Sequence, residues 1–254
     1  MINLKKKLQK KELVIGSWIT LAHPAIAEIM ARAGFDWLAV DLEHSVINIR
    51  ETEELIRIIE LCGSTPLVRL SSNDPVQIKR VMDAGAHGII VPIVNSVREA
   101  EQAVEAVRYP PDGKRGVGLA RAQGYGNNFE NYKEWLKWNS IIIVQIEHIK
   151  AVENLEAILS VENIDGFIVG PYDLSGSLGT PGQFDNKLVV EAMNNIRKFI
   201  KNSSKIAGCH VVEPDIEQFR IRVEEGYRLL AYSVDIRMLD TCCRSAIKSI
   251  KVKV

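Results

Sequence analysis

The stretch AGFDWLAVDLEH, residues 33–44, holds a glycine, a short apolar run and a charged end in close succession. This is the order of a helix that ends, a buried strand that follows, and polar groups at the strand's carboxyl end. The same order returns in AGAHGIIVP (84–92) and EGYRLLAYS (225–233). The repetition favours a barrel over an open doubly wound sheet, which would also call for a glycine-rich phosphate loop after the first strand.

Short runs rich in valine and isoleucine alternate with segments of helical period along the whole chain. Parallel strands covered by crossover helices have this pattern. We expect strands at 14–19, 37–42, 66–70, 88–92, 141–147, 166–170, 205–210 and 228–233. We expect helices at 24–33, 50–61, 75–84, 96–108, 152–159, 187–201, 214–225 and 236–250. The prediction is an α/β fold, a single (β/α)8 TIM barrel that occupies residues 1–254 as one domain.

The composition argues against several classes of protein. Lys plus Arg and Asp plus Glu number 32 each, so there is no basic excess for nucleic-acid binding. The four cysteines form no C-x-x-C pair, which indicates reduced thiols. The basic segment 5–11 and apolar run 13–22 resemble a signal peptide, but Glu12, Ser17 and Thr20 interrupt the run and favour a first strand. We expect a soluble, cytoplasmic protein that binds neither nucleic acid nor membrane.

Charged and polar side chains gather where the expected strands end, at Asp41, Glu43, His44, Arg69, Gln145, Glu147, Asp173 and Asp235. In a barrel the loops that follow the strands surround one pocket. Glu147 and Asp173 follow neighbouring strands, and two carboxylates with water suit Mg²⁺ or Mn²⁺ better than zinc. An ordinary salt-bridged strand end is the alternative.

Arg69 and His44 carry the other hypotheses of function. Arg69 ends an otherwise apolar strand, where its guanidinium offers a bidentate anchor for a carboxylate or an enolate oxygen. An ion pair that closes the barrel mouth is the alternative. His44 follows Asp41 by three residues, so the carboxylate could fix the tautomer of a catalytic base, or His44 could be an ordinary loop histidine. The spacing does not decide between the two.

Further polar features lie beside these residues. Gln145 should share a face with Glu147, because strand residues two apart point the same way. The segment GPYDLS (170–175) offers exposed backbone amides that could form a nest for a carboxylate or phosphate. The loop 118–128, which contains Arg121, is expected to line the substrate side of the pocket.

Five ordered motifs then indicate a family: VDLEH (40–44), PLVR (66–69), YPPDGKRG (109–116), VQIE (144–147) and GPYDLS (170–175). Together they resemble the HpcH/HpaI aldolase family over nearly the whole chain. The resemblance implies a class II aldolase, a carbon–carbon lyase that cleaves a 4-hydroxy-2-oxo acid reversibly to pyruvate and an aldehyde through a metal-stabilised pyruvate enolate. The implied cofactor is Mg²⁺ or Mn²⁺, with Co²⁺ as an alternative.

The resemblance also implies roles for individual residues. Glu147 and Asp173 would hold the metal, and Arg69 would stabilise the enolate oxygen. His44, oriented by Asp41, would move protons through water.

The remaining implied contacts are with the substrate. Gln145 would bind it, and the backbone from Gly170 and Pro171 to Tyr172 and Asp173 would receive the pyruvyl carboxylate. The family further implies a homo-oligomer, a hexamer of paired barrels that exchange the C-terminal helix.

This sequence departs from the family pattern at two places, and two alternative functions are considered. His148 stands where a small hydroxylated residue is expected, and residues 233–235 alter the family's last strand end. The nearest rival is a lyase of malyl-CoA or citramalyl-CoA, which would need a basic surface for the nucleotide phosphates. The second is a non-catalytic barrel that binds a 2-oxo acid or phosphoenolpyruvate.

Overall fold

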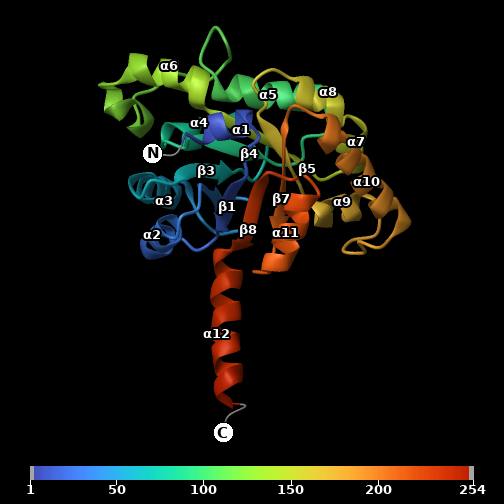
Figure 1. Ribbon diagram of the computed structural model, residues 1–254. Helices are drawn as coiled ribbons and strands as arrows, with labels where there is room; N and C mark the ends of the chain where they lie inside the picture. Colours follow the sequence, from blue (N-terminus) through green and yellow to red (C-terminus); the bar gives the residue numbers. More distant parts are fainter. Residues whose placement is uncertain (1–2, 252–254) are drawn as a thin grey trace.

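The computed structural model describes residues 3–251. Its eight parallel strands close into a barrel in chain order, with β8 pairing to β1 (Figure 1). The strands are β1 (Val14–Ile19), β2 (Trp37–Asp41), β3 (Thr65–Arg69), β4 (Gly88–Val91), β5 (Ile141–Ile146), β6 (Gly166–Val169), β7 (Ile206–Val211) and β8 (Leu229–Val234). The predicted (β/α)8 barrel is confirmed.

Helices on the outside of the barrel connect the strands, and one further helix precedes β1 and another follows β8. They are α1 (Leu4–Gln9), α2 (Pro24–Arg32), α3 (Ile49–Leu61), α4 (Pro75–Asp83), α5 (Val97–Val107), η1 (Arg121–Gly126), α6 (Phe129–Asn139), α7 (Ile149–Glu153), α8 (Leu155–Ser160), α9 (Pro171–Ser177), α10 (Lys187–Asn202), α11 (Ile216–Glu224) and α12 (Asp235–Lys251). The expected helix at 152–159 is two helices that meet at Asn154. The short elements α1, η1 and α9 were not predicted.

The repeated glycine between helix and strand has the conformation that the sequence pattern requires. Gly34, Gly85 and Gly226 have φ angles of 100°, 101° and 99°. This left-handed region is open to glycine without steric penalty and ends each helix just before the next strand begins. The recurring sequence motif is therefore a recurring backbone turn at the amino end of the barrel.

The amino end of the barrel is closed by α1. Leu4 and Leu8 are almost fully buried in the cluster of side chains that fills the barrel interior. Lys5 is also buried and forms an ion pair with Asp165, with 2.6 Å between Nζ and Oδ1. The basic segment that resembles a signal peptide is thus a packed helix. Because α1 covers the amino end of the barrel, a functional site is expected at the carboxyl ends of the strands.

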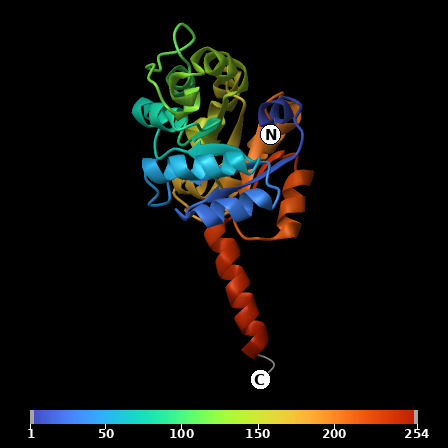
Figure 2. The same ribbon diagram turned by 90° about the vertical axis from the view of Figure 1, so that its left-hand side faces the viewer.

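The last helix, α12, leaves the barrel next to the carboxyl end of β8 and projects away from the body (Figures 1 and 2). Asp235 is its one buried residue. Ile236, Leu239, Ile247 and Ile250 are exposed on it. Nowhere between residues 3 and 251 does a helix have both the length and the apolar character needed to cross a membrane.

Candidate active site

Asp41 and Arg69 meet at the carboxyl ends of β2 and β3, whose register places them side by side. Arg69 Nε donates to Asp41 Oδ1 at 2.8 Å, and Nη2 donates to Oδ2. The Asp41 side chain is completely buried, and its Oδ1 also accepts from the backbone amide of Glu43 at 2.9 Å. Such a forked pair holds the guanidinium in one orientation in the barrel mouth.

Glu43 is an acidic residue just after β2 for which the sequence alone predicts no role. Its Oε2 lies 3.3 Å from Arg69 Nη1 and 3.9 Å from His44 Nε2. Burial raises the pKa of Glu43 to about 7; Arg69 opposes the rise, and the negative charges of Glu147 and Asp41 add to it. Glu43 is therefore a carboxyl group that can hold or release a proton near neutral pH, which is a property of acid–base sites.

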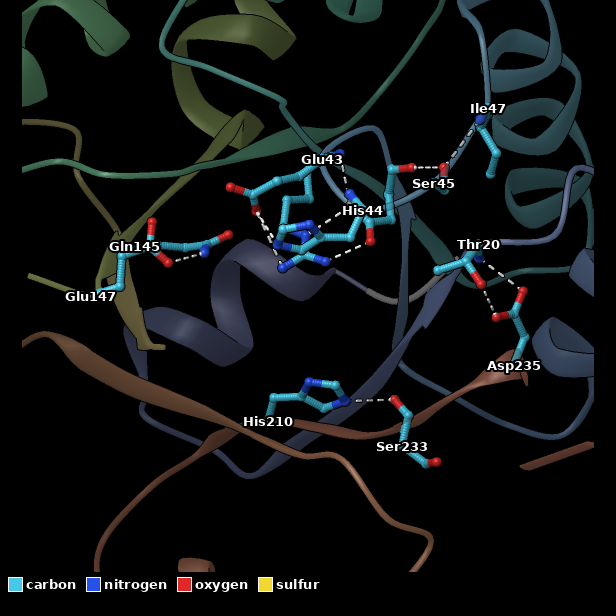
Figure 3. Close-up of polar contacts among 12 residues, drawn as sticks. Thr20, Glu43, His44, Ser45, Ile47, Gln145, Glu147, His210, Ser233 and Asp235 are labelled. Atoms are coloured by element: carbon cyan, nitrogen blue, oxygen red, sulfur yellow. Dashed lines mark hydrogen bonds and ion pairs between the residues drawn. The ribbon is translucent and has the colours of Figure 1, made fainter. Parts of the chain in front are cut away.

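Glu147 follows β5 and is held on both carboxylate oxygens, and Figure 3 shows the contact with Gln145. Oε1 accepts from the Ile93 amide and Oε2 from Gln145 Nε2, each at 2.6 Å. Burial raises the pKa of Glu147, and the Asp173 carboxylate raises it further against the lowering effect of those two hydrogen bonds. A buried carboxylate next to a second one is destabilised unless a positive charge compensates for it.

Gly170 makes room for that carboxylate. A Cβ atom at position 170 would lie 2.8 Å from Glu147 Oε2. The following residues do not form the irregular nest that the sequence suggested, because Pro171 begins the short helix α9. Tyr172 and Asp173 lie in its first turn, where backbone amides have no acceptor within the helix. The expected free amides are therefore present, in a helical turn.

The residues present fit a divalent cation. Gly170 leaves space beside a buried carboxylate, and the exposed Asp173 supplies the second negative charge. Among residues 3–251, no group of three or more His, Cys, Asp or Glu side chains could hold a metal ion. The protein would thus supply two carboxylates, and oxygen atoms from substrate and water would complete the shell, as Mg²⁺ and Mn²⁺ prefer.

The expected contact between Asp41 and the ring of His44 is wrong. Asp41 accepts from the His44 backbone amide at 3.3 Å, while its carboxylate is held by Arg69. The His44 side chain is 66% exposed, and its ring nitrogen Nε2 faces Glu43. Arg69 outcompetes the imidazole because its fixed charge and forked donors match a carboxylate better.

The segment 118–128 does not line the site of its own barrel, so that expectation is also wrong. The Arg121 side chain pairs with Glu60 and donates to the Ala84 carbonyl at 3.1 Å. Both partners lie near the helix ends that precede β3 and β4, at the end of the barrel opposite to α12 (Figure 1). His87 also contacts Glu60 there, at 3.1 Å.

The other polar residues at strand ends divide into structural and unassigned groups. Asp235 accepts from the Thr20 and Leu21 amides, each at 2.8 Å, and ties β8 to β1. His148 caps α7 through Nδ1, which accepts from the Lys150 amide. His210 lies at the end of β7 with Nε2 3.0 Å from the Ser233 carbonyl.

Comparison with known proteins agrees with this geometry. Residues 14–240 match the HpcH/HpaI aldolase/citrate lyase family. The chain belongs to this family. The hydroxypyruvate/pyruvate aldolase of Roseobacter denitrificans is 37% identical over 237 residues, which cover 92% of this chain and 91% of that protein. The 2-keto-3-deoxy-L-rhamnonate aldolase of Escherichia coli K12 is 38% identical over 216 residues, covering 84% and 80%.

The structural comparison gives the same answer. An HpcH/HpaI aldolase/citrate lyase family protein from Burkholderia cenocepacia superposes with a TM-score of 0.93 and 32% sequence identity, over 99% of this chain and all of the other. The predicted family and the predicted carbon–carbon lyase are therefore confirmed. The roles of the individual site residues remain predictions.

Proposed function

We propose that this chain is one catalytic domain, residues 1–254, of a divalent-metal-dependent aldolase that reversibly cleaves a 4-hydroxy-2-oxo acid to pyruvate and an aldehyde. The observation that carries the proposal is the buried Glu147 carboxylate, which lies beside Asp173 in the mouth of a family barrel. Arg69, held by Asp41, supplies the cationic group in the same mouth. Relatives named as aldolases of pyruvate and of a keto-deoxy sugar acid support the substrate class.

The metal would be held by Glu147 and Asp173, and we favour Mg²⁺ or Mn²⁺, with Co²⁺ as the alternative. When bound, the cation supplies positive charge next to the carboxylate and 2-oxo group of the substrate. Gln145 keeps Glu147 in place through its 2.6 Å hydrogen bond. The free amides of Tyr172 and Asp173, reached across Gly170 and Pro171, would receive the pyruvyl carboxylate.

The chemistry in the cleavage direction begins with loss of the proton from the 4-hydroxyl group. The C3–C4 bond then breaks, the aldehyde leaves, and the electron pair gives the enolate of pyruvate, which takes up a proton at C3 to become pyruvate. Arg69 stabilises the negative charge on the enolate oxygen by hydrogen bonds from a guanidinium that Asp41 holds in place. His44, exposed and beside Glu43, would exchange the protons with water.

The ion pairs of two basic residues, Lys114 and Arg115, disfavour the rival acyl-CoA lyase. Such an enzyme needs free cationic groups for the nucleotide phosphates. Lys114 is paired with Glu105 at 2.7 Å, and Arg115 is buried against Asp83, so these two residues do not offer free charges.

We further propose a homo-oligomer in which α12 is exchanged between neighbouring subunits. Ile236, Leu239, Ile247 and Ile250 lie within about 80° of one another around the helix axis, so they form one apolar face. An apolar face on a projecting helix is stabilised by contact with another chain. A hexamer of such pairs is the assembly that the family resemblance implies.

Pyruvate release tests the proposed function directly. Lactate dehydrogenase and NADH report pyruvate formed from a panel of 4-hydroxy-2-oxo acids, with Mg²⁺ or Mn²⁺ and then with EDTA. We expect release with either metal, loss of release in EDTA, and recovery when metal is returned. A lack of pyruvate with every acid and metal would favour the CoA-ester lyase or the non-catalytic barrel.

A further inference from the structure

His210 is an inward histidine that the proposed chemistry does not use. It lies on β7, which stands four strands away from β3 in the closed order of eight. Its Nε2 is 3.0 Å from the carbonyl oxygen of Ser233. A carbonyl oxygen can only accept, so Nε2 carries the ring hydrogen and Nδ1 carries a lone pair. The hydrogen bond thus assigns the tautomer, and Nδ1 can act only as an acceptor.

Aromatic contacts connect His210 to the site. Its ring packs against the edge of Trp18, with 5.7 Å between the ring centroids. Trp18 also contacts Arg69, whose guanidinium carbon lies 4.4 Å from the centroid of the indole ring. His210 and Arg69 are therefore linked through one side chain, and Figure 3 shows the imidazole on the side of the site away from Glu43 and His44.

The free nitrogen of His210 is available to a ligand. Nδ1 has no hydrogen-bond partner in the part of the chain that the structure describes, and it is not among the fully buried atoms without one. Burial lowers the pKa of His210 to about 4, and the charge of Arg69 lowers it as well, against the Ser233 hydrogen bond and Asp41. The imidazole is therefore neutral at neutral pH, and it attracts donors rather than anions.

We propose that His210 is a specificity-determining residue whose Nδ1 accepts a hydrogen bond from a hydroxyl group on the aldehyde part of the substrate. This inference rests on the proposed aldolase function. The groups assigned to pyruvate come from β3, β5 and the segment after β6, so His210 on β7 and Trp18 on β1 border the remainder of the mouth. An acceptor there favours hydroxylated aldehydes over apolar ones and offers nothing to a carboxylate.

The test measures a ratio of rates for matched aldehydes. Pyruvate is added to glycolaldehyde and to acetaldehyde, which differ by one hydroxyl group, and kcat/KM is determined for each. The quantity of interest is the ratio of the two values in each protein. The different reactivity of the free aldehydes cancels when variants are compared.

Two substitutions separate the acceptor from the shape of the side chain. His210→Leu should lower the glycolaldehyde-to-acetaldehyde ratio roughly three- to tenfold, the effect of one hydrogen bond. His210→Asn places an amide oxygen near Nδ1 and should restore most of the ratio. The control His23→Asn replaces a histidine that caps α2 and should leave the ratio at the wild-type value.

The outcomes are distinct. An unchanged ratio in His210→Leu would overturn the inference, and so would an equal loss in His210→Asn and His210→Leu. Metal-dependent exchange of the pyruvate methyl hydrogens with D₂O, followed by NMR in the wild-type protein, tests the aldolase function without an aldehyde. If the pyruvate methyl hydrogens exchange but His210→Leu leaves the glycolaldehyde-to-acetaldehyde ratio unchanged, only the role of His210 is contradicted. If neither exchange nor aldol product is observed, both proposals are contradicted.

Discussion

Asp41 and Arg69 end neighbouring strands and are joined by two parallel hydrogen bonds, one of them 2.8 Å between Nε and Oδ1. Asp41 is completely buried, while 15% of the Arg69 side chain is exposed. The pair therefore has an anchored inner end and an outer end that faces the pocket. Because guanidinium is planar and always charged, its direction is set by the carboxylate beneath it.

Replacement of Arg69 by Lys keeps the charge and removes the fork. We expect kcat/KM for pyruvate release to fall about 10²-fold, because a preorganised donor to the enolate oxygen is lost. The free energy of unfolding should fall by about 1–3 kcal/mol, since Asp41 is left with fewer hydrogen bonds in a buried position. The coupled assay and urea unfolding measure the two effects. Arg57→Lys, at an exposed pair with Glu53, is the control and should change neither.

Glu43 should make stability depend on pH in a defined direction. Its pKa is raised from 4.5 to about 7 in the folded protein, so the folded state binds the proton more tightly. The resulting stabilisation is complete below pH 4.5 and is lost as the pH rises through 7. In EDTA, the difference in unfolding free energy between wild type and Glu43→Gln should shift against the wild type by on the order of 1 kcal/mol from pH 4.5 to 8, after allowance for solvent screening. A constant difference across this range would contradict the raised pKa.

The barrel could be predicted because its determinants are local. Each strand is a short apolar run, and each strand begins and ends within one residue of the expected position. The helix α1 was missed because its sequence is basic, and its position depends on Leu4, Leu8 and the pairing of Lys5 with Asp165 far along the chain. Segment 118–128 was misplaced for a similar reason, since Arg121 finds Glu60 at a separation of 61 residues.

The site could be predicted as a set of residues but not as a set of contacts. Asp41 and His44 are three residues apart, which suggested a dyad, yet Asp41 binds Arg69, which is 28 residues away. Glu43 and His210 were visible as polar residues at strand ends. The pKa values of Glu43 and His210 depend on burial and on neighbouring residues from other strands. The spacing of residues within one strand cannot predict either of these.

His44→Ala should separate an enzyme from a binding protein. Loss of a general base lowers kcat by about 10²–10⁴-fold. Pyruvate affinity, measured by isothermal titration with Mg²⁺ present, should be unchanged because the exposed His44 ring faces Glu43 rather than Glu147 or Asp173, the two residues that we propose as metal ligands. Pyruvate binding without turnover in the wild type and in the variant would indicate the non-catalytic barrel.

The apolar face of α12 should control assembly. Leu239→Asp and Ile247→Asp place charges on that face, and burial of an unpaired charge is strongly unfavourable. We expect the double variant to sediment as a smaller species than the wild type at equal concentration. Ser245→Asp, on the opposite side of the same helix, should leave the sedimentation unchanged. Equal mass for wild type and double variant would show that α12 does not hold subunits together.

The space beside Glu147 should govern metal affinity. In Gly170→Ala the new methyl group would meet Glu147 Oε2 at 2.8 Å, so the carboxylate must move from the position that Ile93 and Gln145 maintain. We expect Mn²⁺ affinity, measured by isothermal titration and by electron paramagnetic resonance of free Mn²⁺, to fall about 10- to 100-fold, as it does when groups that orient metal ligands are disturbed. Gly176→Ala is the matched control, because a methyl group there meets open space on the same helix, α9. Equal Mn²⁺ affinity in Gly170→Ala and wild type would place the metal elsewhere than beside Glu147.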